Sequence, residues 1–241
     1  MFVFWDIDGT LMSCGSDGTK ALNKTFFELH GTENAFLRAG IGNALDFAIL
    51  HRIAAECGIE DFDINAFAPA YVSNLERILA ENGDKRVLPG VVALLEYVRG
   101  RAGWESLLLT SNLRAGAEAK LRSVGLWSYF ADSPCGGFGD APGEKWDAAP
   151  AAIAELAARS GRSPAPRDCI LIGDGVYDIR CAKRIGARHI AVATGWTPAE
   201  ILAAESPEYL FADLADTARV VAAMNGASGA GSRCADGEAV P

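Results

Sequence analysis

Short apolar runs recur along the chain, and in its second half they alternate with segments whose apolar residues repeat at helical spacing. A continuous run of four or five apolar residues is typical of a strand that is buried on both faces of a sheet. Alternating strands and helices predict an α/β fold, in which right-handed crossovers join the strands of a doubly wound parallel sheet. The expected strands cover residues 2–5, 105–110, 168–173, 189–193 and 208–211, and the expected helices cover residues 90–101, 114–124, 147–159, 176–185 and 213–224, with a short helix after Pro198.

Residues 18–82 have a different character, because no strand-like run occurs there and the apolar residues follow helical spacing. The pattern predicts three amphipathic helices, each ending near a glycine that suits a helix C-terminus. We therefore expect an all-helical cap inserted into the α/β core. The predicted organisation is a core of residues 1–14 and 86–225, a helical cap of residues 15–85, and a disordered tail of residues 226–241 that is rich in Gly, Ala and Ser.

Two short segments carry weaker signals. Residues 132–144 are dense in Gly, Pro and Asp, and this composition predicts an exposed loop. In the cap, Arg38 and the glycine-containing residues 40–43 could face a substrate or lie in solvent.

Polar side chains directly follow three of the predicted strands. Asp6 and Asp8 come one residue apart at the end of the first apolar run, and Thr-Ser-Asn at residues 110–112 follows the second. Asp174 and Asp178 follow the third run. Open parallel sheets bind their ligands beside the carboxyl ends of their strands, so these groups are expected to meet in one crevice. Because neighbouring carboxylates repel, four of them favour a bound divalent cation with oxygen ligands, together with an anionic substrate.

These motifs resemble those of the haloacid dehalogenase superfamily of phosphohydrolases. The resemblance is carried by Asp6-Ile7-Asp8-Gly9-Thr10-Leu11, Thr110, Lys145 and Gly173-Asp174 with Asp178, and it covers roughly residues 1–224. Within the superfamily the chain is most similar to the phosphoglycolate-phosphatase-like branch, which has a helical cap after the first motif. The resemblance implies a Rossmann-like core and a Mg²⁺-dependent phosphatase that hydrolyses a small phosphorylated metabolite.

The resemblance also implies a role for each acid after the first strand. Asp6 would be the nucleophile, forming an aspartyl-phosphate that water later hydrolyses. Asp8 would be the general acid and base, and the neighbouring carboxylate is expected to raise its pKa. The main-chain carbonyl of Asp8 would also bind the metal. Dehalogenases of the superfamily lack an acid at this second position, so Asp8 favours phosphate chemistry.

The remaining site residues would bind the metal or the phosphate. Asp174 would be a metal ligand, and Asp178 would support the metal site or orient Lys145, so the expected metal set is Asp6, Asp8, Asp174 and Asp178. Thr110, Ser111, Asn112 and Lys145 would bind the phosphate. Ordinary alternatives are a turn or helix-cap role for each aspartate and for Asn112, and a solvated helix end for Lys145, because the family often has Pro after this lysine and the chain has Trp146.

Composition narrows the possible partners and compartment. The 241 residues carry a formal net charge of −9, which argues against a nucleic-acid partner because phosphate backbones are bound through an excess of Lys and Arg. No apolar run approaches the roughly 18 residues needed to span a bilayer, and no basic region precedes the first apolar run, so neither membrane insertion nor a secretory signal is expected. Six cysteines without a C-x-x-C spacing are expected to be free thiols in a reducing cytoplasm. The pattern indicates no oligomeric state.

Three other functions use similar features. A sugar-phosphate mutase shares the same core, and product analysis would separate it from a phosphatase. A signalling receiver domain also phosphorylates an aspartate on a parallel sheet, but the helical insertion and Asp8 argue against it. A catalytically silent binding protein would give no reason for four acids at corresponding strand ends.

Overall fold

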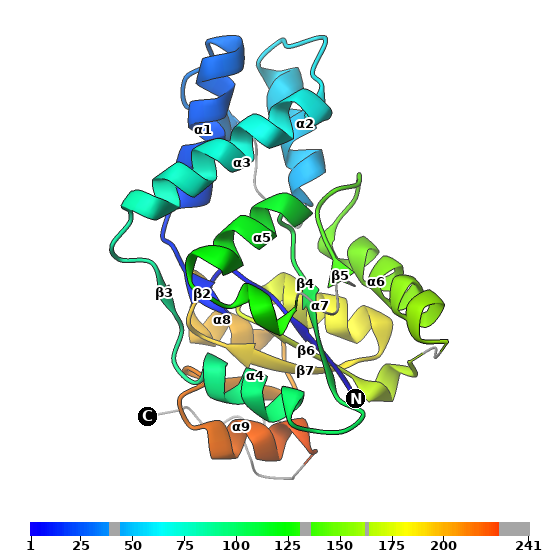
Figure 1. The fold of residues 1–241 in the computed structure, drawn as a ribbon. Helices are drawn as coiled ribbons and strands as arrows, with labels where there is room; N and C mark the ends of the chain where they lie inside the picture. Colours follow the sequence, from blue (N-terminus) through cyan, green and yellow to red (C-terminus); the bar gives the residue numbers. More distant parts are fainter. Residues whose placement is uncertain (39–43, 131–135, 162–163, 227–241) are drawn as a thin grey trace.

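A parallel six-stranded sheet forms the centre of the core in the computed structural model, which describes residues 1–38, 44–130, 136–161 and 164–226 (Figure 1). The strand order is β5-β4-β1-β6-β7-β8, so β1 lies between β4 and β6. This arrangement confirms the predicted doubly wound α/β fold. The strands are β1 (Phe2–Trp5), β4 (Glu105–Leu109), β5 (Gly136–Gly137), β6 (Cys169–Gly173), β7 (Arg188–Val192) and β8 (Tyr209–Phe211).

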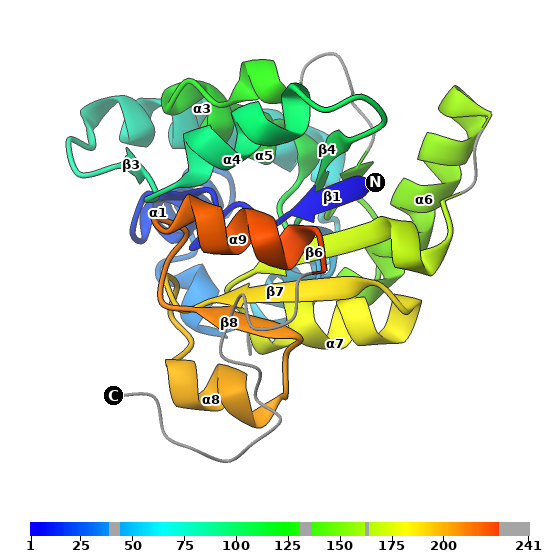
Figure 2. The ribbon, with the colours of Figure 1, turned by 90° about the horizontal axis from the view of Figure 1, so that it is seen from below.

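Helices cover both faces of this sheet, and β1 shows how one strand supports both layers. Side chains alternate along a strand, so Val3 and Trp5 join one hydrophobic cluster with α4, α5 and α9, whereas Phe2 and Phe4 join another with α6 and α7. Figure 2 shows α4 and α9 on one side of the sheet and α7 on the other. The helices are α4 (Val91–Arg99), α5 (Arg114–Ser123), α6 (Lys145–Ser160), α7 (Val176–Ile185), α8 (Ala199–Ala204) and α9 (Thr217–Met224).

Among the described residues between β2 and β3, three α-helices and a 3₁₀ turn lie above the carboxyl edge of the sheet in Figure 1. The segments β2 (Met12–Ser13) and β3 (Arg86–Val87) pair in antiparallel fashion, so the chain leaves and re-enters the core at one place. The elements are α1 (Asp17–His30), η1 (Ala35–Arg38), α2 (Asp46–Glu56) and α3 (Ile64–Glu81), and together they form what we call the helical layer. Stacked and tilted rings of Phe26, Phe62 and Phe67 fill the interior of this layer. The boundaries of core and cap given above stay a prediction.

The expectation of an exposed loop over residues 132–144 is wrong for residues 136–139, whereas residues 140–142 are exposed bends, as expected. Gly136 and Gly137 form the edge strand β5 beside β4, and residues 136–139 are buried. A Cβ on Gly137 would lie 2.5 Å from Leu109 Cδ1 and 2.7 Å from the carbonyl oxygen of Ala148. Only glycine fits between β4 and α6 there, although its low strand propensity pointed to a loop.

Several other expectations lie outside the described residues. These are residues 132–135 of the expected loop, the side chain of Arg38 with residues 40–43, and the tail beyond residue 226. In the part of the chain that the structure describes, none of the helices combines the length and the apolar character that crossing a bilayer requires.

Candidate active site

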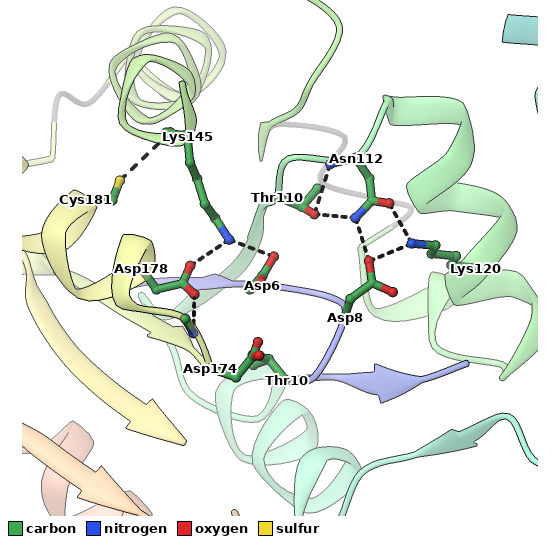
Figure 3. Close-up of polar contacts among 11 residues, drawn as sticks. Asp6, Asp8, Thr10, Thr110, Asn112, Lys120, Lys145, Asp174, Asp178 and Cys181 are labelled. Carbon is green, nitrogen blue, oxygen red and sulfur yellow. Dashed lines mark hydrogen bonds and ion pairs between the residues drawn. The ribbon is translucent and has the colours of Figure 1, made fainter. Parts of the chain in front are cut away.

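The predicted site residues come together at the carboxyl edge of the central strands (Figure 3). Asp6 follows β1, Thr110 follows β4 and Asp174 follows β6, while Lys145 and Asp178 lie in the first turns of α6 and α7. The sheet continues into the site, because the Asp6 backbone N–H donates to the Ile172 carbonyl at 3.0 Å. Parallel neighbours therefore bring residues that are far apart in the sequence to one edge, as expected for an open α/β sheet.

Three buried carboxylates form a compact acidic cluster. Asp6, Asp174 and Asp178 each offer an oxygen, and these oxygens all lie within 4.8 Å of one another. Burial, opposed in part by Lys145, raises the pKa of Asp6 to about 6, and burial together with Asp6 and Asp178 raises the pKa of Asp174 well above its usual value. A hard divalent cation would offset this repulsion, and carboxylate oxygens are its preferred ligands. The cluster therefore fits a divalent metal ion.

Lys145 is buried against this cluster. Its Nζ lies 2.9 Å from Asp6 Oδ1 and 2.6 Å from Asp178 Oδ1. Burial alone would lower the pKa of the Lys145 ammonium, but the two carboxylates outweigh it and raise that pKa. Asp178 is fixed in turn, because its Oδ2 accepts a hydrogen bond from the Gly175 N–H at 2.9 Å. Lys145 is thus not a solvated lysine at a helix end.

Asp8 points away from the cluster, toward α5. Its Oδ2 accepts hydrogen bonds from Lys120 Nζ at 2.6 Å and from Asn112 Nδ2 at 2.9 Å (Figure 3). Burial favours the neutral carboxyl group, but the Lys120 ammonium and the hydrogen bonds outweigh it, so the pKa of Asp8 is lowered. The expectation that a neighbouring carboxylate raises the pKa of Asp8 is therefore wrong, because Lys120 dominates. The carboxylate of Asp8 is not part of the acidic cluster, and metal binding through its main-chain carbonyl stays a prediction.

Lys120 is the main site residue that the sequence analysis missed. Its Nζ also donates to Asn112 Oδ1 at 2.7 Å, and its side chain is only 6% exposed. A signal was present, because Lys120 lies three and four residues after the buried Ala117 and Gly116 of α5 and so occupies the buried face of an amphipathic helix. A lysine at such a position needs a partner.

The residues after β4 have different surroundings. Thr110 is fully buried, and its Oγ1 accepts hydrogen bonds from the N–H and the Nδ2 of Asn112 at 3.3 and 2.7 Å. Its own hydroxyl proton remains available for an anion. Asn112 binds Asp8 and Lys120, whereas Ser111 directs its carbonyl oxygen to the N–H of Asp46 in α2. The three predicted phosphate-binding residues therefore lie together but make different contacts.

Two more residues of the site were not predicted. Thr10 is buried, and its hydroxyl donates to Asp174 Oδ1 at 2.9 Å. It belongs to the first motif, so its position beside a predicted metal ligand could have been inferred. Asp46 begins α2, and its Oδ2 accepts a hydrogen bond from the Leu113 N–H at 3.1 Å. Nothing in the sequence distinguishes Asp46 from an ordinary acid in the first turn of a helix.

A pocket of about 300 Å³ lies between the helical layer and the core. Backbone hydrogen bonds hold α2 against the core beside it, from Leu45 to Gly143, from Asp46 to Ser111 and from Phe47 to Gly139. The pocket is lined by Asp8, Gly15, Gly18, Thr19, Leu22, Phe36, Ala44, Asp46, Ile49, Tyr71, Ser111, Asn112, Lys120 and Trp196.

The chain is similar to known proteins in sequence and in structure. The probable phosphatase IndB of Dickeya dadantii is 28% identical over 211 residues, which are 86% of this chain and 87% of the relative. A phosphoglycolate phosphatase of Pseudomonas putida is 28% identical over 217 residues, covering 88% of this chain and 76% of the relative. The crystal structure of CbbY from Rhodobacter sphaeroides in complex with phosphate has a TM-score of 0.66 at 22% identity, over 89% of this chain and 95% of that one. At this identity the structural likeness supports the fold.

The strongest comparison is with a family model. The model described as haloacid dehalogenase-like hydrolase matches residues 3–183, well over half of the chain. The match contains the first strand with Asp6 and Asp8, and it extends through Asp174 and Asp178. The chain therefore belongs to the haloacid dehalogenase-like hydrolase family, as its motifs predicted.

Proposed function

We propose that the chain is a Mg²⁺-dependent phosphatase that hydrolyses phosphomonoesters of small metabolites through an aspartyl-phosphate. The observation that carries this proposal is the separation of the acids into two groups. Lys145 lies against Asp6 and Asp178, while Asp8 is held separately by Lys120. A nucleophile and an acid–base group with different environments are what a two-step phosphoryl transfer requires.

In the first step, a carboxylate oxygen of Asp6 attacks phosphorus and the bond to the leaving oxygen breaks. Lys145 holds Asp6 in place, and its ammonium offsets the charge that accumulates around the phosphoryl oxygens. Thr110 can donate its hydroxyl proton to one of these oxygens. A divalent ion bound by Asp6, Asp174 and the carbonyl of Asp8 would neutralise further charge on the phosphate. Mg²⁺ suits such a site, since it takes few carboxylates together with substrate oxygens.

Asp8 would transfer the protons in both steps. It would protonate the leaving alkoxide, and as a carboxylate it would then accept a proton from the water that hydrolyses the aspartyl-phosphate. Lys120 lowers the pKa of Asp8 in the free protein, which suits the second role. An incoming phosphate dianion raises the pKa of a nearby carboxyl group, and this favours protonation before the first step.

The relatives support a small soluble substrate. The Pseudomonas putida relative is named a phosphoglycolate phosphatase, and the pocket of about 300 Å³ suits a small metabolite. We also infer a reducing compartment such as the cytoplasm, because Cys14, Cys57, Cys169 and Cys181 are free thiols.

The test is phosphate release from an aryl phosphate, with and without Mg²⁺, by the wild type and by Asp6→Asn. The amide is nearly isosteric with the carboxylate, so the variant should fold but release no phosphate. Product analysis with a hexose phosphate would detect a mutase, which would return an isomer in place of free phosphate. Retained activity in Asp6→Asn would exclude Asp6 as the nucleophile.

A further inference from the structure

The part of the substrate beyond the phosphate would lie in the pocket between the helical layer and the core. This placement rests on the proposed function. Asp8 lines the pocket, whereas Asp6 and Lys145 are not among its lining residues. If Asp8 protonates the leaving oxygen, the leaving group must begin beside Asp8 and extend away from Asp6. The chemistry of the pocket lining therefore bears on the choice of substrate.

The charges of this lining are unusual for a site that accepts an anionic leaving group. Of the described residues that line the pocket, Lys120 is the one cation, and it already binds Asp8 at 2.6 Å and Asn112 at 2.7 Å. Asp46 adds a second carboxylate to the lining. Most other lining groups are neutral or apolar, including Leu22 and Tyr71. Among the described lining residues, a substrate carboxylate would thus meet two aspartates, and the one cation there is already bound to other side chains.

Asp46 is held firmly in this position. Its N–H donates to the Ser111 carbonyl at 2.9 Å, and its Oδ2 accepts from the Leu113 N–H at 3.1 Å. Both contacts are to core residues at or beside the predicted phosphate-binding segment, so turning the carboxylate away from the pocket would break its hydrogen bond to the Leu113 N–H. Its other oxygen has no hydrogen-bond partner among the described residues and can accept a bond from a substrate.

We propose that Asp46 determines substrate specificity by rejecting phosphomonoesters that carry a second anionic group and by accepting those that carry a hydroxyl or an ammonium group. Like charges in one pocket repel, and an unpaired charge is a common means of excluding a competing substrate. Phosphoglycolate carries a carboxylate close to its phosphate, so it should be a poor substrate for this chain. Hydroxyalkyl and aminoalkyl phosphates of similar size should be better.

The test compares kcat/KM for three phosphates of matched size: phosphoglycolate, 2-hydroxyethyl phosphate and O-phosphoethanolamine. An aryl phosphate serves as the reference substrate. The wild type should prefer the hydroxyl and ammonium compounds over phosphoglycolate by about tenfold or more. Asp46→Asn keeps an oxygen for the Leu113 N–H and removes the charge, so it should reduce this preference by about tenfold. Asp61→Asn, which removes a charge from an exposed position of the helical layer, should leave the preference unchanged.

Two results would overturn the inference while leaving the proposed function intact. One is a wild type that hydrolyses phosphoglycolate better than the two other compounds. The other is an Asp46→Asn variant that folds, as shown by circular dichroism, with an unchanged preference. Should this variant fold poorly, Asp46→Ser and the charge-retaining Asp46→Glu supply the comparison, and the wild-type ranking decides by itself. A wild type that hydrolyses nothing, the aryl phosphate included, would overturn the proposed function and this inference with it.

Discussion

At the scale of single residues, two buried lysines divide four aspartates of the site into two groups. Lys145 holds Asp6 and Asp178, and Lys120 holds Asp8. Removing Lys145 would leave Asp6 and Asp178 as uncompensated buried charges, at a cost of about 3–5 kcal/mol, whereas the pair of Lys120 with Asp8 is screened more by solvent, because the Asp8 side chain is 42% exposed. The sequence motifs pointed to Asp6, Asp8, Asp174, Asp178 and Lys145, which the structure brings to one edge of the sheet, and their roles stay a prediction. They could not predict Lys120, because its partner lies 112 positions away in the sequence and the contact depends on how α5 packs.

Asp46 provides a prediction about stability and pH. Burial raises its pKa to about 6, from 3.8. Between pH 3.8 and about pH 6 the native state binds more protons at Asp46 than the unfolded state does. The free energy of unfolding therefore falls as the pH rises through this range. This destabilisation is absent below about pH 4 and complete above about pH 6, and it amounts to about 3 kcal/mol.

Replacing Asp46 by Asn removes this destabilisation. Urea unfolding at pH 7.5 should therefore show Asp46→Asn to be more stable than the wild type by up to about 3 kcal/mol. The difference should disappear near pH 4, where the wild-type carboxyl group is neutral. A difference of the same size at both pH values would contradict the assigned pKa. Asp61→Asn is the control for a change of charge alone.

At the scale of elements, the strand ends were predictable but the close approaches between segments were not. Apolar runs predicted β1, β4 and β6, and with them the edge at which the site forms. The strand β5 consists of Gly136 and Gly137, and glycine carries no hydrophobic signal. Its burial follows from the narrow space between β4 and α6, which is a property of the packed structure.

Gly195, in the loop after β7, is another glycine whose lack of a side chain allows a close approach, here to the site residue Asp174. A Cβ there would lie 1.6 Å from Asp174 Oδ2. Gly195→Ala should therefore displace the Asp174 carboxylate and raise the Mg²⁺ concentration needed for half-maximal activity by about tenfold. The melting temperature should change little, because the clash falls on the end of a side chain.

Gly83→Ala is the matched control for this substitution. Nothing lies within 4 Å of a Cβ at Gly83, so the metal requirement should stay as in the wild type. A metal titration of Gly195→Ala that coincides with the wild-type curve would show that Asp174 does not bind the metal.

At the scale of the whole molecule, the helical layer is joined to the core at more than its two chain connections. The first two residues of α2 donate backbone hydrogen bonds to Ser111 and Gly139, the preceding Leu45 donates one to Gly143, and α3 packs on α5. The spacing of apolar residues predicted the helices of this layer. It could not predict how they pack on the core, which depends on backbone contacts and on the lack of a side chain at Gly139, where a Cβ would lie 1.9 Å from the Ser111 carbonyl oxygen.

These contacts predict slow hydrogen exchange at the start of α2. The amides of Leu45, Asp46 and Phe47 should be protected in the absence of substrate, as buried hydrogen-bonded amides in a folded core are. Exchange followed by NMR would measure this, with the amide of Asp61, in an exposed turn, as the unprotected reference. Exchange of all four amides at the same fast rate would mean that the helical layer opens freely from the core.

The central claim is that Asp6 becomes phosphorylated during turnover. The most direct measurement is a rapid acid quench of the wild type and of Asp6→Asn during reaction with an aryl phosphate and Mg²⁺, followed by peptide mapping by mass spectrometry. We predict one phosphorylated peptide that contains residues 2–11, with the phosphate on Asp6 and absent from the variant. Turnover without any phosphorylated peptide, or a phosphate on another residue of the wild type, would contradict the account.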